Sequence, residues 1–417
     1  MEDYFNSEEF KCILKKYEDM LQYKIGEFLD SEELADIAEY YISIEEFDKA
    51  KEALDFALEI FPDSVPLLYN LARMIVYQEG NIDKAYALAE QMNDKTDFNY
   101  FSLIAELKCL EKKEDEANGL LKNHLSELKY YEDESTEEYI LDCAKLFVYF
   151  DYPEIAKEWL EMYEDKDNSE YKEVLGQLYT ILGNYDASNK ILNNLLDEEP
   201  HSHEYWDQLA DNNFQQGDLE GALSASEYSI AINPNNQHAI LNKANALFAL
   251  GNSDEALKFY ENYLNLCRED EKSIVYISMG HIELGEGNFD LASKYFADGI
   301  DTATCREIAY IQVAIAGFDN GLIGFAYKLL RENLPQTPKD WKQGYAVFAR
   351  CCFELNKMDE YNRSLPEAIS MDKEECKETL SELYPNDCKP IDYMKYQPNE
   401  EKRRTDLTTN WDSFFNK

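Results

Sequence analysis

A pair of small residues 12 positions apart, once 13, recurs nine times along this chain. The first members of the pairs are Ala38, Ala72, Ala105, Ala144, Gly176, Ala210, Ala244, Gly280 and Ala314. The second members are Ala50, Ala85, Ala117, Ala156, Ser188, Ala222, Ala256, Ala292 and Ala326. Successive pairs begin 32 to 39 residues apart, so one structural unit of about 34 residues is repeated with small insertions and deletions.

Large apolar residues at helical spacing flank each small pair. Around Ala210, for example, Trp206, Leu209 and Phe214 share one helical face, and Leu223 follows in the next segment. Two antiparallel helices approach closely only where the side chains at their crossing are small. The pattern therefore predicts one helical hairpin per repeat, with the large apolar groups filling the seam between the helices.

The best copies share further residues at fixed places. Segment 203–236 contains Trp206, Leu209, Ala210, Gly217, Leu219, Ala222 and Pro234. Segment 169–202 contains Leu175, Gly176, Tyr179, Gly183, Tyr185 and Pro200, and segment 273–304 contains Tyr276, Gly280, Gly287, Phe289, Ala292 and Phe296. This pattern resembles the tetratricopeptide repeat family. The resemblance extends over residues 31–365 and implies an all-α fold, an α-α superhelix of about ten antiparallel helix pairs.

Four segments are expected along the chain. Residues 1–30 contain a capping helix at 7–25, residues 31–365 form the repeat array, residues 366–384 form a closing helix begun by Ser370 or Asp372, and residues 385–417 are a tail. A cap is needed at each end because a terminal repeat otherwise exposes a seam that is meant for a neighbour. We therefore predict one elongated repeat body rather than several globular domains.

The tail and one long interval leave alternatives open. The tail carries the one tight basic cluster, Lys402 to Arg404, and ends in an apolar segment with Trp411, Phe414 and Phe415. Packing on its own last repeats is preferred, but disorder or docking onto another copy would also fit.

The 39-residue interval before Ala144 predicts either a longer second helix or, as we favour, a lengthened turn with Ser135 or Thr136 as N-cap.

The charge of the chain limits its partners. Formal net charge is −45, from 85 acidic and 40 basic side chains. Nucleic-acid binding and attraction to an anionic membrane both depend on Lys and Arg, so neither is expected. The acidity either only keeps the protein soluble or also steers a basic partner toward it.

The N-terminus and the cysteines point to the cytoplasm. The first residues are acidic where a secretion signal needs basic and then apolar residues, and no apolar run approaches the ~18 residues of a membrane span. Nine scattered Cys residues without CxxC spacing are typical of reduced thiols.

Sequence signs of catalysis are missing. The chain has no GxSxG, no Gly-rich phosphate loop, no HExxH and no Cys/His metal quartet. His201 and His203 are best explained by a polar turn, and the adjacent Cys351 and Cys352 by packing. We therefore predict a non-enzyme with no catalytic residues, no metal site and no cofactor.

In the tetratricopeptide family, the first helix of each hairpin lines a concave face that holds peptides or helices. Carried over to this chain, that geometry implies inward-facing polar residues toward the N-terminal end, namely Glu32, Asp36, Glu39, Asn70, Arg73, Asn99, Glu106, Glu138, Asp142 and Lys145. The predicted partner-binding residues lie further along the chain. They are the polar Glu170, Glu173, Asp207, Asp211, Asn242 and Asn245, and the apolar Ile274, Ile277, Ile308 and Ile311.

These residues predict a protein-interaction scaffold that binds a protein or peptide segment with basic and apolar side chains. The carboxylates suit Lys or Arg, Asn suits backbone amides, and the isoleucines, with Phe318, suit an apolar anchor. Alternatively, the acidic residues are only a solvated helix face and the isoleucines are buried. A structural, self-assembling protein, docking through its Trp/Phe terminus or an array end, is the second functional hypothesis.

Overall fold

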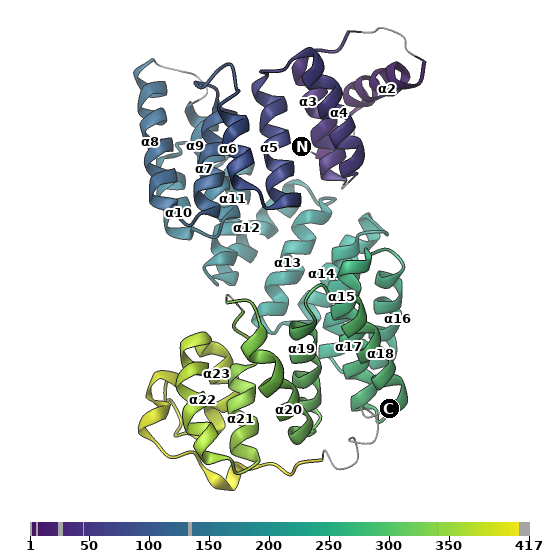
Figure 1. Cartoon of the computed structure of the whole chain (residues 1–417), viewed down its shortest axis with the longest axis vertical. Coiled ribbons are helices and arrows are strands. Elements are labelled where there is room, and N and C mark those ends of the chain that lie inside the picture. The colour runs from purple at the N-terminus through teal and green to yellow at the C-terminus, as the bar shows by residue number, and fades with distance from the viewer. Residues whose placement is uncertain are drawn as a thin grey trace. The chain divides into compact units, whose positions relative to one another are not determined.

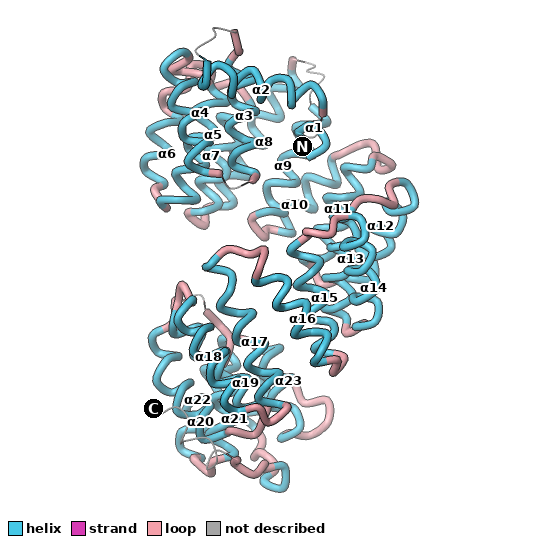
Figure 2. Tube along the Cα trace, turned by 90° about the vertical axis from the view of Figure 1, so that its right-hand side faces the viewer, coloured by secondary structure: helices cyan, strands magenta, loops and turns pink. Residues whose placement is uncertain are grey.

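The computed structural model describes residues 2–5, 7–23, 28–44, 46–131, 136–339 and 341–407. Within these ranges the regular structure is entirely helical, as Figures 1 and 2 show. The chain divides into two compact units, Met1–Glu198 and Glu199–Lys417. Each unit is described by itself below.

The first unit contains twelve α-helices within the described residues. Their bounds are α1 Glu2–Phe5, α2 Glu8–Tyr23, α3 Ser31–Ser43, α4 Phe47–Ile60, α5 Val65–Glu79, α6 Ile82–Ala89, α7 Phe98–Leu110, α8 Glu114–Tyr130, α9 Thr136–Tyr149, α10 Pro153–Met162, α11 Ser169–Ile181 and α12 Tyr185–Glu198.

The second unit contains eleven α-helices over its described part, together with short 3₁₀ turns. The helices are α13 His203–Gln216, α14 Leu219–Ile232, α15 Gln237–Ala249, α16 Ser253–Leu264, α17 Lys272–Gly285, α18 Phe289–Thr302, α19 Arg306–Asp319, α20 Ile323–Asn333, α21 Tyr345–Glu354, α22 Met358–Met371 and α23 Lys373–Leu380. The 3₁₀ turns are η1 Glu269–Glu271, η2 Leu334–Gln336, η3 Ser381–Leu383, η4 Pro390–Lys395 and η5 Glu400–Lys402.

Consecutive helices pair as hairpins, from α3 with α4 to α21 with α22. The described residues thus contain ten such pairs, and the prediction of an all-α array of helix pairs is confirmed. The first helix of one pair also contacts the first helix of the next, as α3 does with α5 and α17 with α19.

The recurrent small residues lie at the crossings of these helices. Every one of the eighteen is buried. At Gly280 the reason is direct, since a Cβ there would lie 2.6 Å from the Phe296 ring on the partner helix and 3.2 Å from the Ala292 carbonyl oxygen. The repeat spacing thus follows from the close approach of two helices.

Ala222 on α14 and Ala256 on α16 provide a test of this packing. Replacing either by Leu should lower the free energy of unfolding by about 1–3 kcal/mol, because the added atoms have no space in the hairpin. Urea denaturation followed by circular dichroism measures the loss. Ala231→Leu, at an exposed position of α14, is the matched control and should change little. If Ala222→Leu and Ala256→Leu were as stable as the Ala231→Leu control, this would contradict the tight packing of the two hairpins.

Additional helices lie next to the first and last hairpins. Phe10, Ile13 and Tyr17 of α2 are buried in one core cluster with Leu34 of α3. At the other end, the single closing helix expected at 366–384 is two helices. Helix α22 continues through Pro366 to Met371, and the Asp372 side chain then caps α23 by accepting hydrogen bonds from the Glu374 and Glu375 N–H groups.

The long interval before Ala144 is explained mainly by a helix. Helix α8 has 17 residues, whereas α4, the second helix of the first pair, has 14. The alternative of a longer second helix is therefore supported, and the turn that we favoured falls mostly on residues 132–135, which lie outside the described residues. Thr136 begins α9, and the alternative cap Ser135 lies outside the described residues.

The tail packs within the second unit as far as the structure describes it. The Asn399 N–H donates to the Leu383 carbonyl oxygen at 2.8 Å, and the Leu407 N–H donates to the Gly321 carbonyl oxygen at 2.9 Å. The predicted apolar terminus, Trp411, Phe414 and Phe415, lies outside the described residues.

Candidate functional site

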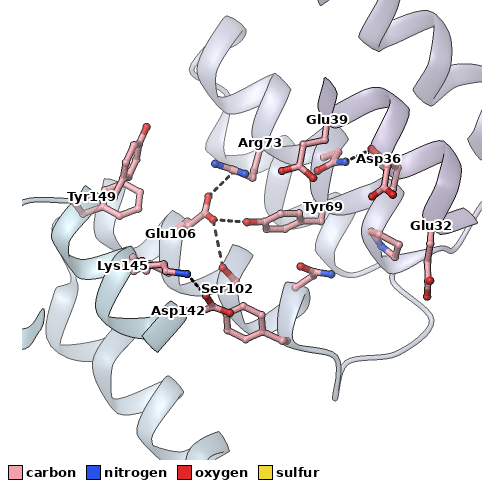
Figure 3. Close-up of a pocket in the computed structure, with 17 residues that line it drawn as sticks. Glu32, Asp36, Glu39, Tyr69, Arg73, Ser102, Glu106, Asp142, Lys145 and Tyr149 are labelled. Carbon is pink, nitrogen blue, oxygen red and sulfur yellow. Dashed lines mark hydrogen bonds and ion pairs between the residues drawn. The ribbon is translucent and has the colours of Figure 1, made fainter. Parts of the chain in front are cut away.

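A cavity of about 620 Å³ lies in the first unit (Figure 3). Four successive first helices, α3, α5, α7 and α9, supply all of its lining residues except Phe150. The lining residues are Glu32, Ala35, Asp36, Glu39, Pro66, Tyr69, Asn70, Arg73, Phe98, Asn99, Ser102, Glu106, Asp142, Lys145, Leu146, Tyr149 and Phe150. The inward face of the first helices is therefore hollowed here.

Local sequence signals position these helices. The Asp30 side chain accepts from the Glu32 and Glu33 N–H groups, and the Glu33 side chain accepts from the Asp30 N–H, so a capping box fixes the start of α3. Asp97 caps α7 by accepting from the Asn99 N–H. From the start of α3, Glu32, Asp36 and Glu39 follow at i, i+4 and i+7, which places three carboxylates on one helix face.

Arg73 of α5 is the cation at the centre of one network in this cavity. Its Nε lies 3.3 Å from Glu106 Oε2, and the Tyr69 hydroxyl donates to Glu106 Oε1 at 2.8 Å. The Ser102 hydroxyl donates to the same oxygen at 3.5 Å. Burial raises the pKa of Glu106, although Arg73 opposes the shift. Glu106 thus holds Arg73 and Tyr69 in place.

Lys145 of α9 is the second cation, and carboxylates also neutralise it. Its Nζ lies 3.1 Å from Asp142 Oδ1 and also pairs with Glu170. Burial raises the pKa of Asp142, and the Lys145 charge opposes that shift. Both cations of the cavity therefore have anionic partners.

The carboxylates of α3 are left in excess. Asp36 accepts a hydrogen bond from the Tyr4 hydroxyl of α1 at 2.7 Å. Half-buried Glu39 has no hydrogen bond or ion pair among the described residues, and Figure 3 shows it near Arg73. Burial raises the pKa of both Asp36 and Glu39, and Arg73 lowers that of Glu39 in part. These two partly desolvated carboxylates are the charges that a cation entering the cavity would stabilise.

Aromatic rings complete the wall formed by α7 and α9. Phe98, Tyr149 and Phe150 line the cavity, and the Tyr149 hydroxyl lies 3.0 Å from that of Tyr77. An apolar side chain, or the alkyl stem of a Lys or Arg, can pack on such rings. The site therefore combines cation-binding and apolar surfaces.

The polar groove residues expected toward the N-terminal end come together in this cavity. Nine of the ten line it, and Glu138 does not. Of the ten predicted partner-binding residues, Glu170 and Glu173 lie on α11 of the first unit, and the other eight lie in the second unit. Glu170 is engaged by Lys145, and Glu173 is half-buried.

The predicted polar residues of the second unit bond mainly to one another and to neighbours. Asp207 Oδ2 accepts from the Asn236 amide at 2.6 Å, and Asp211 accepts from the Asn242 amide at 2.7 Å. His238 Nε2 lies 3.0 Å from Asp211, and this hydrogen bond raises the pKa of His238. Asn245 Oδ1 accepts from the Tyr260 hydroxyl. These groups join α13 to α15 and α15 to α16.

The predicted isoleucines do not form a continuous apolar floor. Ile277 is 4% exposed and packs in a core cluster with Phe296, and Ile311 is fully buried. A Cβ on Gly299 of α18 would lie 2.7 Å from Ile277, and a Cβ on Gly344 would lie 2.8 Å from Ile311, so both isoleucines contribute to packing inside the array. Ile274 is half-exposed and Ile308 is partly buried, so only these two of the four retain substantial exposed surface.

Several residues of the cavity were not expected from the sequence. Tyr69, Ser102 and Tyr149 reach it from first-helix positions that the family pattern did not select. Tyr4 reaches Asp36 from the helix that precedes the array. Across the described ranges, no cluster of three or more His, Cys, Asp or Glu could hold a metal ion. In those same ranges, no helix has the length and hydropathy needed to cross a bilayer.

Comparison with known families identifies the repeat. The tetratricopeptide repeat family model matches residues 213–271, which include α14, α15 and α16. Together with the ten helix pairs of the described structure, this match confirms the resemblance. The tetratricopeptide repeat assignment therefore applies by sequence to residues 213–271, and the other helix pairs of the described structure have the same hairpin architecture.

Solved structures share parts of this arrangement. The type IV pilus biogenesis factor PilW is 15% identical, with a TM-score of 0.40, over 51% of this chain and 98% of its own. The Cut9–Hcn1 hetero-tetramer of the APC/C gives 14% identity and a TM-score of 0.39 over 91% of this chain and 88% of that chain. PilF of Pseudomonas aeruginosa gives 15% identity and a TM-score of 0.37 over 51% of this chain and 97% of its own. The comparison with curated proteins gives no match. At these identities and TM-scores, the similarities carry no inference about function.

Proposed function

We propose that this protein is a non-catalytic interaction scaffold. Its first unit binds an extended protein segment in which a Lys or Arg side chain lies next to an apolar one. The cationic side chain enters the cavity beside Asp36 and Glu39, and the apolar side chain packs on Phe98 and Tyr149. A cytoplasmic location, predicted from the sequence, is part of the proposal.

One observation carries the proposal, namely the excess of carboxylates on α3. Arg73 and Lys145 already pair with carboxylates, whereas the partly desolvated Glu39 has no hydrogen bond or ion pair among the described residues. A charge held in a partly buried place gains more from an opposite charge than an exposed one does. A guanidinium or ammonium group is the ligand that relieves this excess.

The test compares the wild type with the double variant Asp36→Asn plus Glu39→Gln. The probes are fluorescein-labelled peptides with one fixed position, occupied in turn by Arg, Lys, Leu, Asp or Gly, and binding is measured by fluorescence anisotropy. The wild type should prefer Arg or Lys, and the double variant should bind these peptides about tenfold more weakly, which corresponds to roughly 1.4 kcal/mol. Lowering the pH should also weaken binding to the wild type, because burial raises the pKa of Asp36 and Glu39, so both lose their charge at a higher pH than exposed carboxylates do.

The matched control is Asp55→Asn plus Glu59→Gln. These two exposed carboxylates lie on α4, the second helix of the same hairpin, so this variant has the same net charge as the test variant. It should bind the peptides as the wild type does. Equal weakening by both double variants would show that net charge, rather than the cavity, attracts the peptides.

Exposed residues of the second unit extend the proposal. Asp211, Ile274 and Ile308 have enough accessible surface to contact a partner. In the first unit, Glu170 pairs with Lys145, and the half-buried Glu173 lies on the same helix, α11. Asp207, Asn242 and Asn245 also belong to the proposed binding surface. The hydrogen bonds described above hold these three side chains in position to contact a partner. Screening of the purified chain against broad hydrolase and transferase substrates tests the non-catalytic part.

A further inference from the structure

A second cavity, of about 780 Å³, lies in the second unit. Helices α19, α21 and α23 supply most of its lining, including Phe318, Asp319, Arg350 and Glu378. Five lining residues come from outside these helices, namely Gln215, Gln343, Asp372, Glu382 and Arg404. Of these, Arg404 belongs to the tail that follows the array.

The Arg404 side chain lies between a ring and two carboxylates. Its guanidinium carbon is 4.0 Å from the centre of the Phe318 ring, and its Nε is 3.5 Å from Glu354 Oε1. Asp319 lines the same cavity as Arg404. Burial raises the pKa of Asp319, and the Arg404 charge opposes that shift. Stacking on a ring together with pairing to carboxylates is how proteins recognise arginine.

Backbone contacts hold the tail on both sides of Arg404. Before it, Arg350 Nη2 donates to the Lys402 carbonyl oxygen at 3.2 Å. After it, the Gly324 N–H donates to Asp406 Oδ1 at 3.0 Å. The Leu407 side chain packs against Gly321, which adopts φ +78°, and a Cβ on this glycine would lie 3.1 Å from Leu407. An extended segment with a basic cluster is thus laid over α19 and α21.

We propose that the α19–α21 face is a binding surface for arginine-containing protein segments, and that residues 402–407 occupy it as an intramolecular competitor. The proposal does not depend on the cavity of the first unit. It assigns a partner chemistry to the second unit and a means of regulating access to it.

Competition follows from the covalent link. A segment attached to its own site has an effective concentration in the millimolar range, so a free peptide of the same sequence competes poorly with it. Arg404 and Leu407 nevertheless remain partly exposed, and beyond Arg404 the segment is held through the Asp406 side chain and the Leu407 N–H. Weakening the contacts beyond Arg404 should therefore release the surface without altering Phe318, Asp319 or Glu354.

The experiment uses the full chain with Asp406→Ala plus Leu407→Ala, and a fluorescein-labelled peptide with the sequence of residues 399–407 as the probe. Anisotropy should show at least ~10-fold tighter binding of this peptide to the double variant than to the wild type. The same peptide with alanine in place of Arg404 should not show this increase. Adding Asp319→Asn to the double variant should weaken binding, and adding Asp359→Asn, which removes an exposed carboxylate of α22, should not.

Three results would overturn the proposal. The first is that the double variant does not bind the tail peptide although its helical circular dichroism is intact. The second is that the tail peptide and its Arg404→Ala form bind the double variant equally. The third is that the wild type and the double variant bind the tail peptide with equal affinity. If the double variant loses helicity, Asp406→Ala alone gives the same comparison with a smaller increase. The variant Asp36→Asn plus Glu39→Gln should bind the tail peptide as the wild type does. A loss there would place the peptide in the first unit and contradict the assignment.

Discussion

Replacing Arg350 by methionine is expected to lower the free energy of unfolding of the second unit by about 3–5 kcal/mol. The Arg350 side chain is 1% exposed and that of Glu354 is fully buried, with 2.6 Å between Nε and Oε1. Arg350 also pairs with Glu382 at 2.7 Å and donates to the carbonyl oxygens of Thr379 and Lys402. The substitution leaves the Glu354 charge buried with only the partly exposed Arg404 beside it, and it separates α21 from α23 and the tail.

Urea denaturation followed by circular dichroism measures this loss. The double variant Arg350→Met plus Glu354→Leu removes both buried charges and should recover a large part of the stability. Arg268→Met breaks ion pairs that are exposed, and it should change stability by less than about 0.5 kcal/mol. If Arg350→Met were as mild as Arg268→Met, the buried pair would not hold the end of the array.

Trp159→Ala is expected to cost about 3–5 kcal/mol in the first unit. Trp159 of α10 is fully buried, its ring lies 6.1 Å from that of Tyr139, and its Nε1 donates to Asn118 Oδ1 at 3.0 Å. Truncation leaves a cavity and an unpaired amide oxygen. Because α10 supports α9, which carries Asp142, Lys145 and Tyr149, peptide binding in the first unit should weaken as well.

Tyr130→Ala is the control for this substitution. Tyr130 is also aromatic and lies in the same unit, but it is 80% exposed, so its removal should change stability little. Trp159→Phe should give an intermediate loss. A Trp159→Ala variant that melts like Tyr130→Ala would contradict the packing of α9 on α10.

The hairpins could be predicted because two closely packed helices leave room only for small side chains at the point where they cross. No side chain larger than serine occupies the eighteen crossing positions, and at Gly280 even a methyl group would meet the Phe296 ring. The Asp372 cap could be predicted for a similar local reason, since its side chain binds N–H groups only two and three residues ahead.

The composition of the site was harder to predict, because it depends on contacts between repeats. Glu106 meets Arg73 from 33 residues further along the chain, and Tyr4 meets Asp36 from outside the array. A family position rule places a residue on a helix face but does not say whether that face meets water or the neighbouring first helix. For this reason Glu39 lies in a cavity, whereas Ile277 and Ile311 are buried inside the array.

Photo-crosslinking tests the proposed binding face most directly. A Lys- or Arg-containing peptide selected by anisotropy, with a benzophenone next to its basic residue, is irradiated with the full chain, and the crosslinked residues are mapped by mass spectrometry. The proposal predicts crosslinks to α3, α5, α7 and α9 that disappear in the Asp36→Asn plus Glu39→Gln variant. Crosslinks confined to the second helices α4, α6 and α8, unchanged in that variant, would contradict it.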